Sequence, residues 1–151
     1  MPTLVREELL ANRASALATL ASATFGTGRN LTSIPDMETF SSFAAMFDGD
    51  DSQVDGPEGA NLMNLSFDVE LWVKADSEED LGPAFSELLR LVSAKMFEDT
   101  NCGGKADWCL YGGVTGLRTD KTEGAPPLMA GIATFTIRYQ TALFDLTVQG
   151  P

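Results

Sequence analysis

The stretch from Leu62 to Ala75, LMNLSFDVELWVKA, decides the fold of this chain. Apolar and mainly polar side chains alternate strictly along it, which predicts a long antiparallel strand with one face in a core. Trp72 stands on the otherwise polar face. Two interpretations of it stay open: an aromatic that covers a neighbouring strand, or an anchor at a subunit contact, where Trp is enriched. The predicted core face consists of Leu65, Phe67, Val69, Leu71 and Val73.

One amphipathic helix is predicted before this strand in the sequence, and another is predicted after it. Residues 3–24 repeat apolar side chains at spacings of three, four and seven, with Thr3 as a possible cap. A second helix opens near Ser77 or Asp80 and runs to about Phe97. Pro83 is tolerable only in its first turn. The predicted buried stripe of this helix consists of Leu81, Phe85, Leu88, Leu89, Val92 and Met96.

Three further strands are predicted, at 42–47, 114–121 and 129–141. The first is ambiguous, because its phenylalanines also fit helical spacing, and a strand is favoured. Long loops are predicted at about 48–61, which is rich in Asp, Gly and Pro, and at 99–113, which is rich in glycine.

The element order is therefore helix, strand, strand, helix, strand, strand. Because each helix needs an apolar surface and the sheet supplies one, the predicted class is α+β. The expected architecture is a two-layer sandwich, with two helices on one face of a mainly antiparallel sheet of about four strands. We expect residues 1–151 to form a single domain, since the chain is long enough for one core.

The acidic stretch FDGDDSQVDGPEG at 47–59 begins like a calcium loop. From Asp48, an EF-hand needs glycine at loop position six and glutamate at position twelve. Gln53 and Gly59 stand there instead. The stretch is better interpreted as the tip of a hairpin between the strand at 42–47 and the strand that starts near Leu62.

Charge and composition exclude several functions. The net charge is −12, and residues 30–100 hold sixteen acidic and three basic side chains, which makes tight binding to nucleic acid improbable. The absence of histidine removes Ser-His-Asp and Cys-His catalysis. Cys102 and Cys109 alone are too few for a structural zinc site, so free thiols are favoured over a disulfide. Asp68 and Glu70 share a strand face, a spacing more typical of a solvated face than of a paired-carboxylate enzyme.

The N-terminal stretch lacks the basic-then-apolar layout of a signal peptide, and no apolar run reaches the ~18 residues of a membrane span. Synthesis in a cytoplasm is expected. No metal, cofactor or catalytic residue is predicted.

Four segments together resemble the tail terminator proteins of long-tailed phages, the minor tail protein U-like family. They are VREELLANRASALATLASA, IPDMETFSSFAAMFDGDD, LSFDVELWVKADSEEDLGPAFSELLRLV and IATFTIRYQTALFD. The resemblance covers nearly the whole chain and rests on element order and strand endings. The segment at 37–46 is longer than the usual first strand of that family.

The resemblance implies a structural virion protein without covalent chemistry. Such proteins form a ring, generally of six copies, that caps the head-proximal end of the tail tube, stops its polymerisation and provides the surface for joining the head. The implied partners are further copies of the chain, the tail tube protein and a head–tail connector, with DNA passing through the lumen without tight binding. A tail-completion or head–tail joining protein of the neck is the alternative. Candidate contacts are Asp48, Asp50, Asp51, Asp55, Glu58, Trp72, Trp108 and Tyr111.

Overall fold

The computed structural model describes residues 2–56 and 58–150. Three residues of the predicted domain lie outside the described residues: Met1, Pro57 and Pro151. Pro57 also belongs to the predicted loop at 48–61. The elements are α1 (Val5–Ala18), β1 (Phe25–Arg29), β2 (Ser42–Val54), β3 (Ala60–Lys74), α2 (Glu78–Phe97), β4 (Trp108–Asp120), β5 (Leu128–Ala142) and β6 (Asp145–Gln149).

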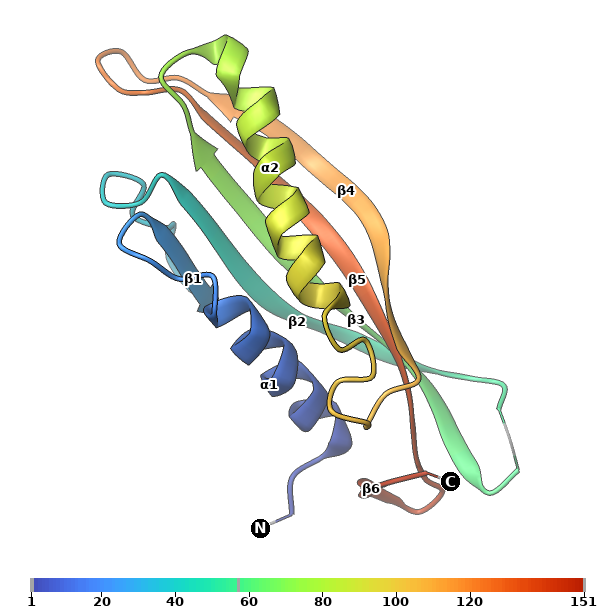
Figure 1. Ribbon diagram of the computed structural model, residues 1–151. Helices are drawn as coiled ribbons and strands as arrows, with labels where there is room; N and C mark the ends of the chain where they lie inside the picture. The colour runs from blue at the N-terminus through green and yellow to red at the C-terminus, as the bar shows by residue number, and fades with distance from the viewer. Residues whose placement is uncertain (1, 57, 151) are drawn as a thin grey trace.

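The elements form two layers: a sheet ordered β1-β2-β3-β5-β4, and both helices on one of its faces (Figure 1). β6 pairs with the last residues of β5, beyond the point where β4 starts opposite Arg138. All strand pairs are antiparallel except β1 with β2. The predicted α+β class is confirmed. The expected count of about four strands missed the short strands β1 and β6, of five residues each.

The core lies between the sheet and the two helices. Every apolar residue predicted on the core face of β3 is buried, and Phe67 stacks on Phe135 of β5 with ring centroids 5.4 Å apart. Of the stripe predicted for α2, five residues are buried and Leu89 is half-buried. The alternation of β3 and the stripe of α2 therefore dictate the packing, as the sequence indicates.

The first helix is shorter than predicted, since α1 ends at Ala18 rather than near residue 24. Leu4 stands at its N-cap and makes no side-chain cap hydrogen bond, so the prediction of Thr3 as the cap is wrong. The segment that follows the helix is needed to reach the sheet, where β1 begins at Phe25.

The second helix begins directly after Ser77, which places Pro83 in the second turn and corrects the first-turn prediction. The proline removes the amide that would bond the carbonyl of Glu79. Because Glu79 lies at an exposed position, water can satisfy that carbonyl and the helix continues. Ser77 donates its hydroxyl to the Asp80 carboxylate, 2.9 Å away.

The predicted loop at 48–61 is largely wrong, because β2 continues to Val54 and β3 begins at Ala60. Asp48 and Asp51 pair with Phe67 and Leu65 of β3, on either side of a bulge. Gly49 fits there because a Cβ atom would lie 2.3 Å from the Ser66 carbonyl oxygen. An outer strand needs no apolar side chains on its solvent side, so polar composition does not end it.

The predicted loop at 99–113 is likewise too long, because β4 begins at Trp108. Its register shifts twice, near Tyr111 and near Thr115. Gly113 and Gly116 adopt φ values of 111° and 64° at these irregularities, a conformation that favours glycine. The glycines bend the strand without ending it.

Candidate functional site

Both margins of the sheet are open. β1 pairs only with the first five residues of β2, so the rest of β2 forms the margin beyond it. On the opposite side, β4 pairs only with β5, and β6 continues the same margin (Figure 1). We refer to these margins, with their flanking loops, as the β1/β2 edge and the β4/β6 edge. Open strands are the parts of a sheet best able to join another chain.

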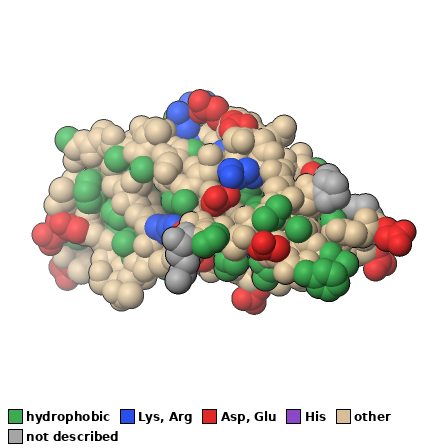
Figure 2. Space-filling view, turned by 90° about the horizontal axis from the view of Figure 1, so that it is seen from below, with side chains coloured by type: hydrophobic (Ala, Val, Ile, Leu, Met, Phe, Trp, Pro, Cys, Tyr) green, Lys and Arg blue, Asp and Glu red, His purple; other side chains and the backbone are tan. Residues whose placement is uncertain are grey.

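The β4/β6 edge collects exposed apolar side chains. Of the ten large hydrophobic residues exposed in the described chain, eight lie on or beside it. Phe144, at the turn into β6, is 95% exposed. Hydrophobic side chains also reach the surface at the end of the molecule that carries β6 (Figure 2). The eight are Phe97, Leu110, Tyr111, Leu117, Leu143, Phe144, Leu146 and Val148.

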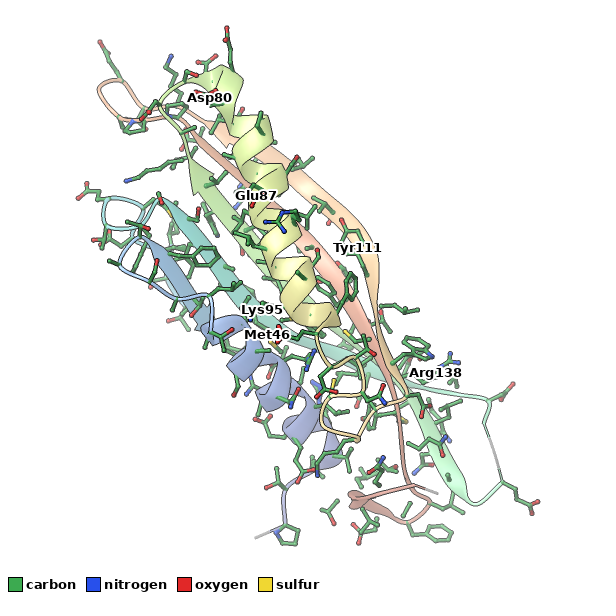
Figure 3. All side chains as sticks on the ribbon, in the orientation of Figure 1. Met46, Asp80, Glu87, Lys95, Tyr111 and Arg138 are labelled. Atoms are coloured by element: carbon green, nitrogen blue, oxygen red, sulfur yellow. The ribbon has the colours of Figure 1, made fainter. Side chains whose placement is uncertain are left out.

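The apolar side chains of β4 lie on both faces of the sheet. Tyr111 packs on Phe135 from the helix side, with ring centroids 5.6 Å apart (Figure 3). Leu110 pairs with Thr136, whose side chain is on the opposite face from Phe135. A partner strand at this edge would therefore find apolar contacts above and below its backbone.

The β1/β2 edge is acidic instead. Arg29 of β1 bonds Asp48 through two nitrogens, at 2.8 and 2.9 Å, and Glu7 of α1 at 3.0 Å. The hydrogen bond from Arg29 holds the pKa of Asp48 below its usual value. Asp50 is exposed on the same strand. One cation thus serves two carboxylates and leaves an excess of negative charge.

Asp51 has a different role from its acidic neighbours. It accepts a hydrogen bond from the Tyr139 hydroxyl at 2.8 Å. Burial first, and then this carboxylate, raise the pKa of Tyr139 above its ordinary value. Nearby, Arg6 of α1 donates to the Gly49 carbonyl oxygen at 2.6 Å. These bonds fix the bulged part of β2 against β5 and α1.

The two edges differ in charge because acidic and basic residues balance near one of them. Residues 101–151 carry four acidic and four basic side chains, whereas the preceding hundred residues carry the whole net charge of −12. The four basic residues lie on β4, on β5 opposite the start of β4, or in the flanking loops. They are Lys105, Arg118, Lys121 and Arg138.

The sheet face without helices carries two tryptophan–arginine stacks. Arg118 lies over Trp72, and Arg138 over Trp108, each 4.8 Å from the ring centroid. Arg118 also bridges to Glu70 at 3.0 Å. Trp72 is half-buried and reaches across β5, which fits the interpretation that it covers neighbouring strands.

A groove of about 800 Å³ crosses the same face. The connector from β1 to β2 forms one wall, and Trp72 and Arg118 form part of the floor. Within residues 2–56 and 58–150, no group of three or more Cys, Asp or Glu residues is placed to hold a metal. Asp68 accepts from the Thr134 hydroxyl at 2.8 Å, so it and Glu70 are both engaged with neighbours.

The predicted contact residues do not form one site. Asp48, Asp50 and Asp51 lie on β2, and Asp55 and Glu58 are exposed in the short turn towards β3. Trp72 and Trp108 share the helix-free face but stand eight positions apart along β5, opposite Ala130 and Arg138. The remaining residue, Tyr111, lies on the helix side of the β4/β6 edge.

Sequence reasoning missed most of the apolar residues of the β4/β6 edge. The interpretation of 99–113 as a loop concealed Leu110, and no strand was predicted over LFDLTV at 143–148. Its alternation of Phe144, Leu146 and Val148 is a strand signal that could have been used.

Both cysteines are free and buried. Burial raises the pKa of the Cys109 thiol to about 12.

No family model matches the chain, and no curated protein matches it. Among solved structures, it is similar to a chain of "Virion of native gene transfer agent (GTA) particle". The two share 13% sequence identity with a TM-score of 0.38, over 89% of this chain and 90% of the other. A likeness this low carries no argument about fold or function.

No helix in the described part of the chain is long and apolar enough to cross a membrane.

Proposed function

We propose that this chain is a structural protein of a phage-like virion, and specifically a tail terminator. It would form a ring on the head-proximal end of the tail tube, stop tube polymerisation and present the surface that joins the head. Its site would be the virion tail, after assembly in the host cytoplasm. The proposal starts from the resemblance in sequence, and needs no cofactor and no covalent chemistry.

One observation carries the proposal: eight exposed apolar side chains line a single open sheet edge. Apolar residues gathered into one exposed patch mark interaction sites, whereas scattered ones need no explanation. An open edge of this length is a hazard to a protein that stays alone. A chain whose open edge is covered by neighbouring molecules avoids that hazard, and rings arise when such contacts close by rotation.

Capping requires the two ends of the ring to differ. One end would reproduce the contacts of a tube subunit, and the other would lack the surface that the next tube subunit needs. The excess of acidic groups would repel the phosphates of DNA passing through the lumen. The residues predicted as contacts remain candidates in this proposal: Asp48, Asp50, Asp51, Asp55, Glu58, Trp72, Trp108 and Tyr111.

Deletion of the gene from the phage or particle that encodes the chain tests the proposal. Loss of a terminator should give tails of uncontrolled length in electron micrographs, and the wild-type gene supplied from a plasmid should restore the length. Tails of normal length that stay apart from heads would identify a tail-completion or head–tail joining protein instead. Normal, infectious particles would refute both functions.

A further inference from the structure

We propose that β4 of one copy pairs with β1 of the next, antiparallel, so that the sheet continues across the subunit boundary. This inference rests on the proposed function, since it names the contact that would close the ring. Its three supports are strand direction, apolar complementarity and charge.

Strand direction makes the two edges compatible. β1 runs parallel to β2, and the successive antiparallel pairs β2–β3, β3–β5 and β5–β4 leave β4 running opposite to β1. A second copy, displaced in the plane of the sheet without being inverted, therefore brings its β1 alongside β4 in antiparallel orientation. Antiparallel pairs outnumber parallel ones in known sheets.

Apolar complementarity supports the same arrangement. One exposed large hydrophobic residue, Ile34, lies on the other side of the sheet, after β1. Ile34 is 80% exposed, in the connector that forms one wall of the groove. A neighbouring β4 edge would supply apolar side chains on both faces of the sheet, to the α1 side and to the connector side.

Charge argues against a two-fold contact between two β1/β2 edges. The β1/β2 edge carries Asp48 and Asp50, with Glu38 in the connector, and its cation Arg29 is already shared by two carboxylates. Two such edges would repel each other. Near the end of β4, Arg118 and Lys121 pair with Glu70 and Glu78 of their own chain, and Asp120 lies beside them, so this edge is close to neutral. It therefore repels the acidic edge less than a second acidic edge would.

Two edge variants test the contact by complementation. The first carries Leu110→Lys and Leu117→Lys on β4, and the second carries Glu38→Lys and Asp50→Lys on the acidic edge. All four positions are exposed, so the substitutions should leave the fold intact. Lysine on an open strand opposes pairing. A matched control carries Glu79→Lys and Ser86→Lys on the exposed side of α2.

The oligomeric state by sedimentation, with circular dichroism as the check on folding, gives the readout. The wild type and the control should form rings. Each edge variant alone should stay monomeric, with its association constant reduced at least about tenfold. An equimolar mixture should give a one-to-one pair, because one intact β4 edge and one intact β1 edge remain.

The other outcomes overturn the inference in distinguishable ways. Dimers of the Glu38/Asp50 variant alone would show β4 pairing with β4, and dimers of the Leu110/Leu117 variant alone would show the acidic edges pairing. Rings formed by both variants would place the contact elsewhere and leave the proposed function standing. A wild type that remains monomeric at all protein and salt concentrations would remove the ring itself, and both proposals with it.

Discussion

The two open edges of this sheet handle exposure in opposite ways. The β1/β2 edge is acidic, and Arg29 of β1 connects it to α1 by donating hydrogen bonds to both Asp48 and Glu7. The β4/β6 edge is apolar and bent by glycines. Charged side chains on an edge are a recognised defence against unwanted pairing, whereas apolar ones favour association. From this difference we infer that the charged β1/β2 edge determines which surface can bind, and that the apolar β4/β6 edge supplies most of the contact area.

The largest expected effect comes from removing the aromatic support of the apolar edge. Phe135 is fully buried and contacts Phe67, Phe97 and Tyr111. Phe135→Ala should lower the free energy of unfolding by about 3–5 kcal/mol, since it loses burial and leaves a cavity. Urea denaturation followed by tryptophan fluorescence measures this.

Phe144 provides the matched control for that substitution. It is the same residue type, at the turn from β5 into β6, but it is almost entirely exposed, so Phe144→Ala should change the free energy of unfolding by less than about 0.5 kcal/mol. Equal losses for the two variants would mean that Phe144 is packed in solution, and would contradict the description of this edge as an open apolar surface.

The second effect concerns the contact between the two helices that cover the sheet. Arg13 of α1 is 2% exposed and donates to the carbonyl oxygens of Met96 and Glu98 at the end of α2, at 2.9 and 3.2 Å. It thereby satisfies carbonyls that a helix end leaves without partners. Arg13→Met should cost about 2 kcal/mol, because buried acceptors lose a charged donor.

Arg90→Met is the comparison for Arg13. Arg90 lies on the exposed side of α2 and pairs only with Glu87 three residues away, so its loss should cost less than about 0.5 kcal/mol. Thermal melts of both variants at pH 7 give the difference. If Arg13→Met melts with the wild type, the hydrogen bonds from Arg13 do not stabilise the contact between α1 and α2.

The sequence predicted the centre of this molecule better than its margins. β3 and α2 could be predicted because burial on one face imposes a strict period of two or 3.6 residues on them. β1, β4 and the second half of β2 face solvent or a partner on one side, and so carry glycine and acid where an inner strand carries valine. Arg13 lies between Leu9 and Leu17 on an apolar stripe of α1. No sequence pattern indicates that its guanidinium bonds carbonyl oxygens at the end of α2. The candidate site lies almost wholly in these margins, which is why few of its apolar residues were predicted.

A smaller effect tests the acidic edge by pH. The pKa of Asp48 is held below its usual 3.8, first by the hydrogen bond from Arg29. A depressed folded-state pKa gives stability that is present above the unfolded value and lost as pH falls through the folded value. Asp48→Asn should therefore cost about 1 kcal/mol at pH 7, and this cost should shrink as the pH falls below 3.8 and the wild-type carboxylate takes up its proton.

Asp50→Asn is the control for Asp48, since Asp50 is exposed on the same strand. Urea denaturation of the wild type and both variants at pH 7 and at low pH measures the two differences. A loss for Asp48→Asn that stays constant across this range would show that the carboxylate acts through shape and not charge.

The smallest effect distinguishes long-range repulsion from local attraction between the edges. Each copy carries −12, so copies repel at low salt, where the Debye length is about 30 Å. At about 0.15 M salt it falls to about 8 Å, which removes most of this repulsion but screens charge pairs buried at a contact much less. Association should therefore strengthen several-fold as salt rises, by less than about 1 kcal/mol per contact, and divalent cations should act in the same direction. Sedimentation against salt measures it. Rings that fall apart as salt rises would mean that attraction between charges on the two edges, and not the apolar β4/β6 edge, supplies most of the contact energy.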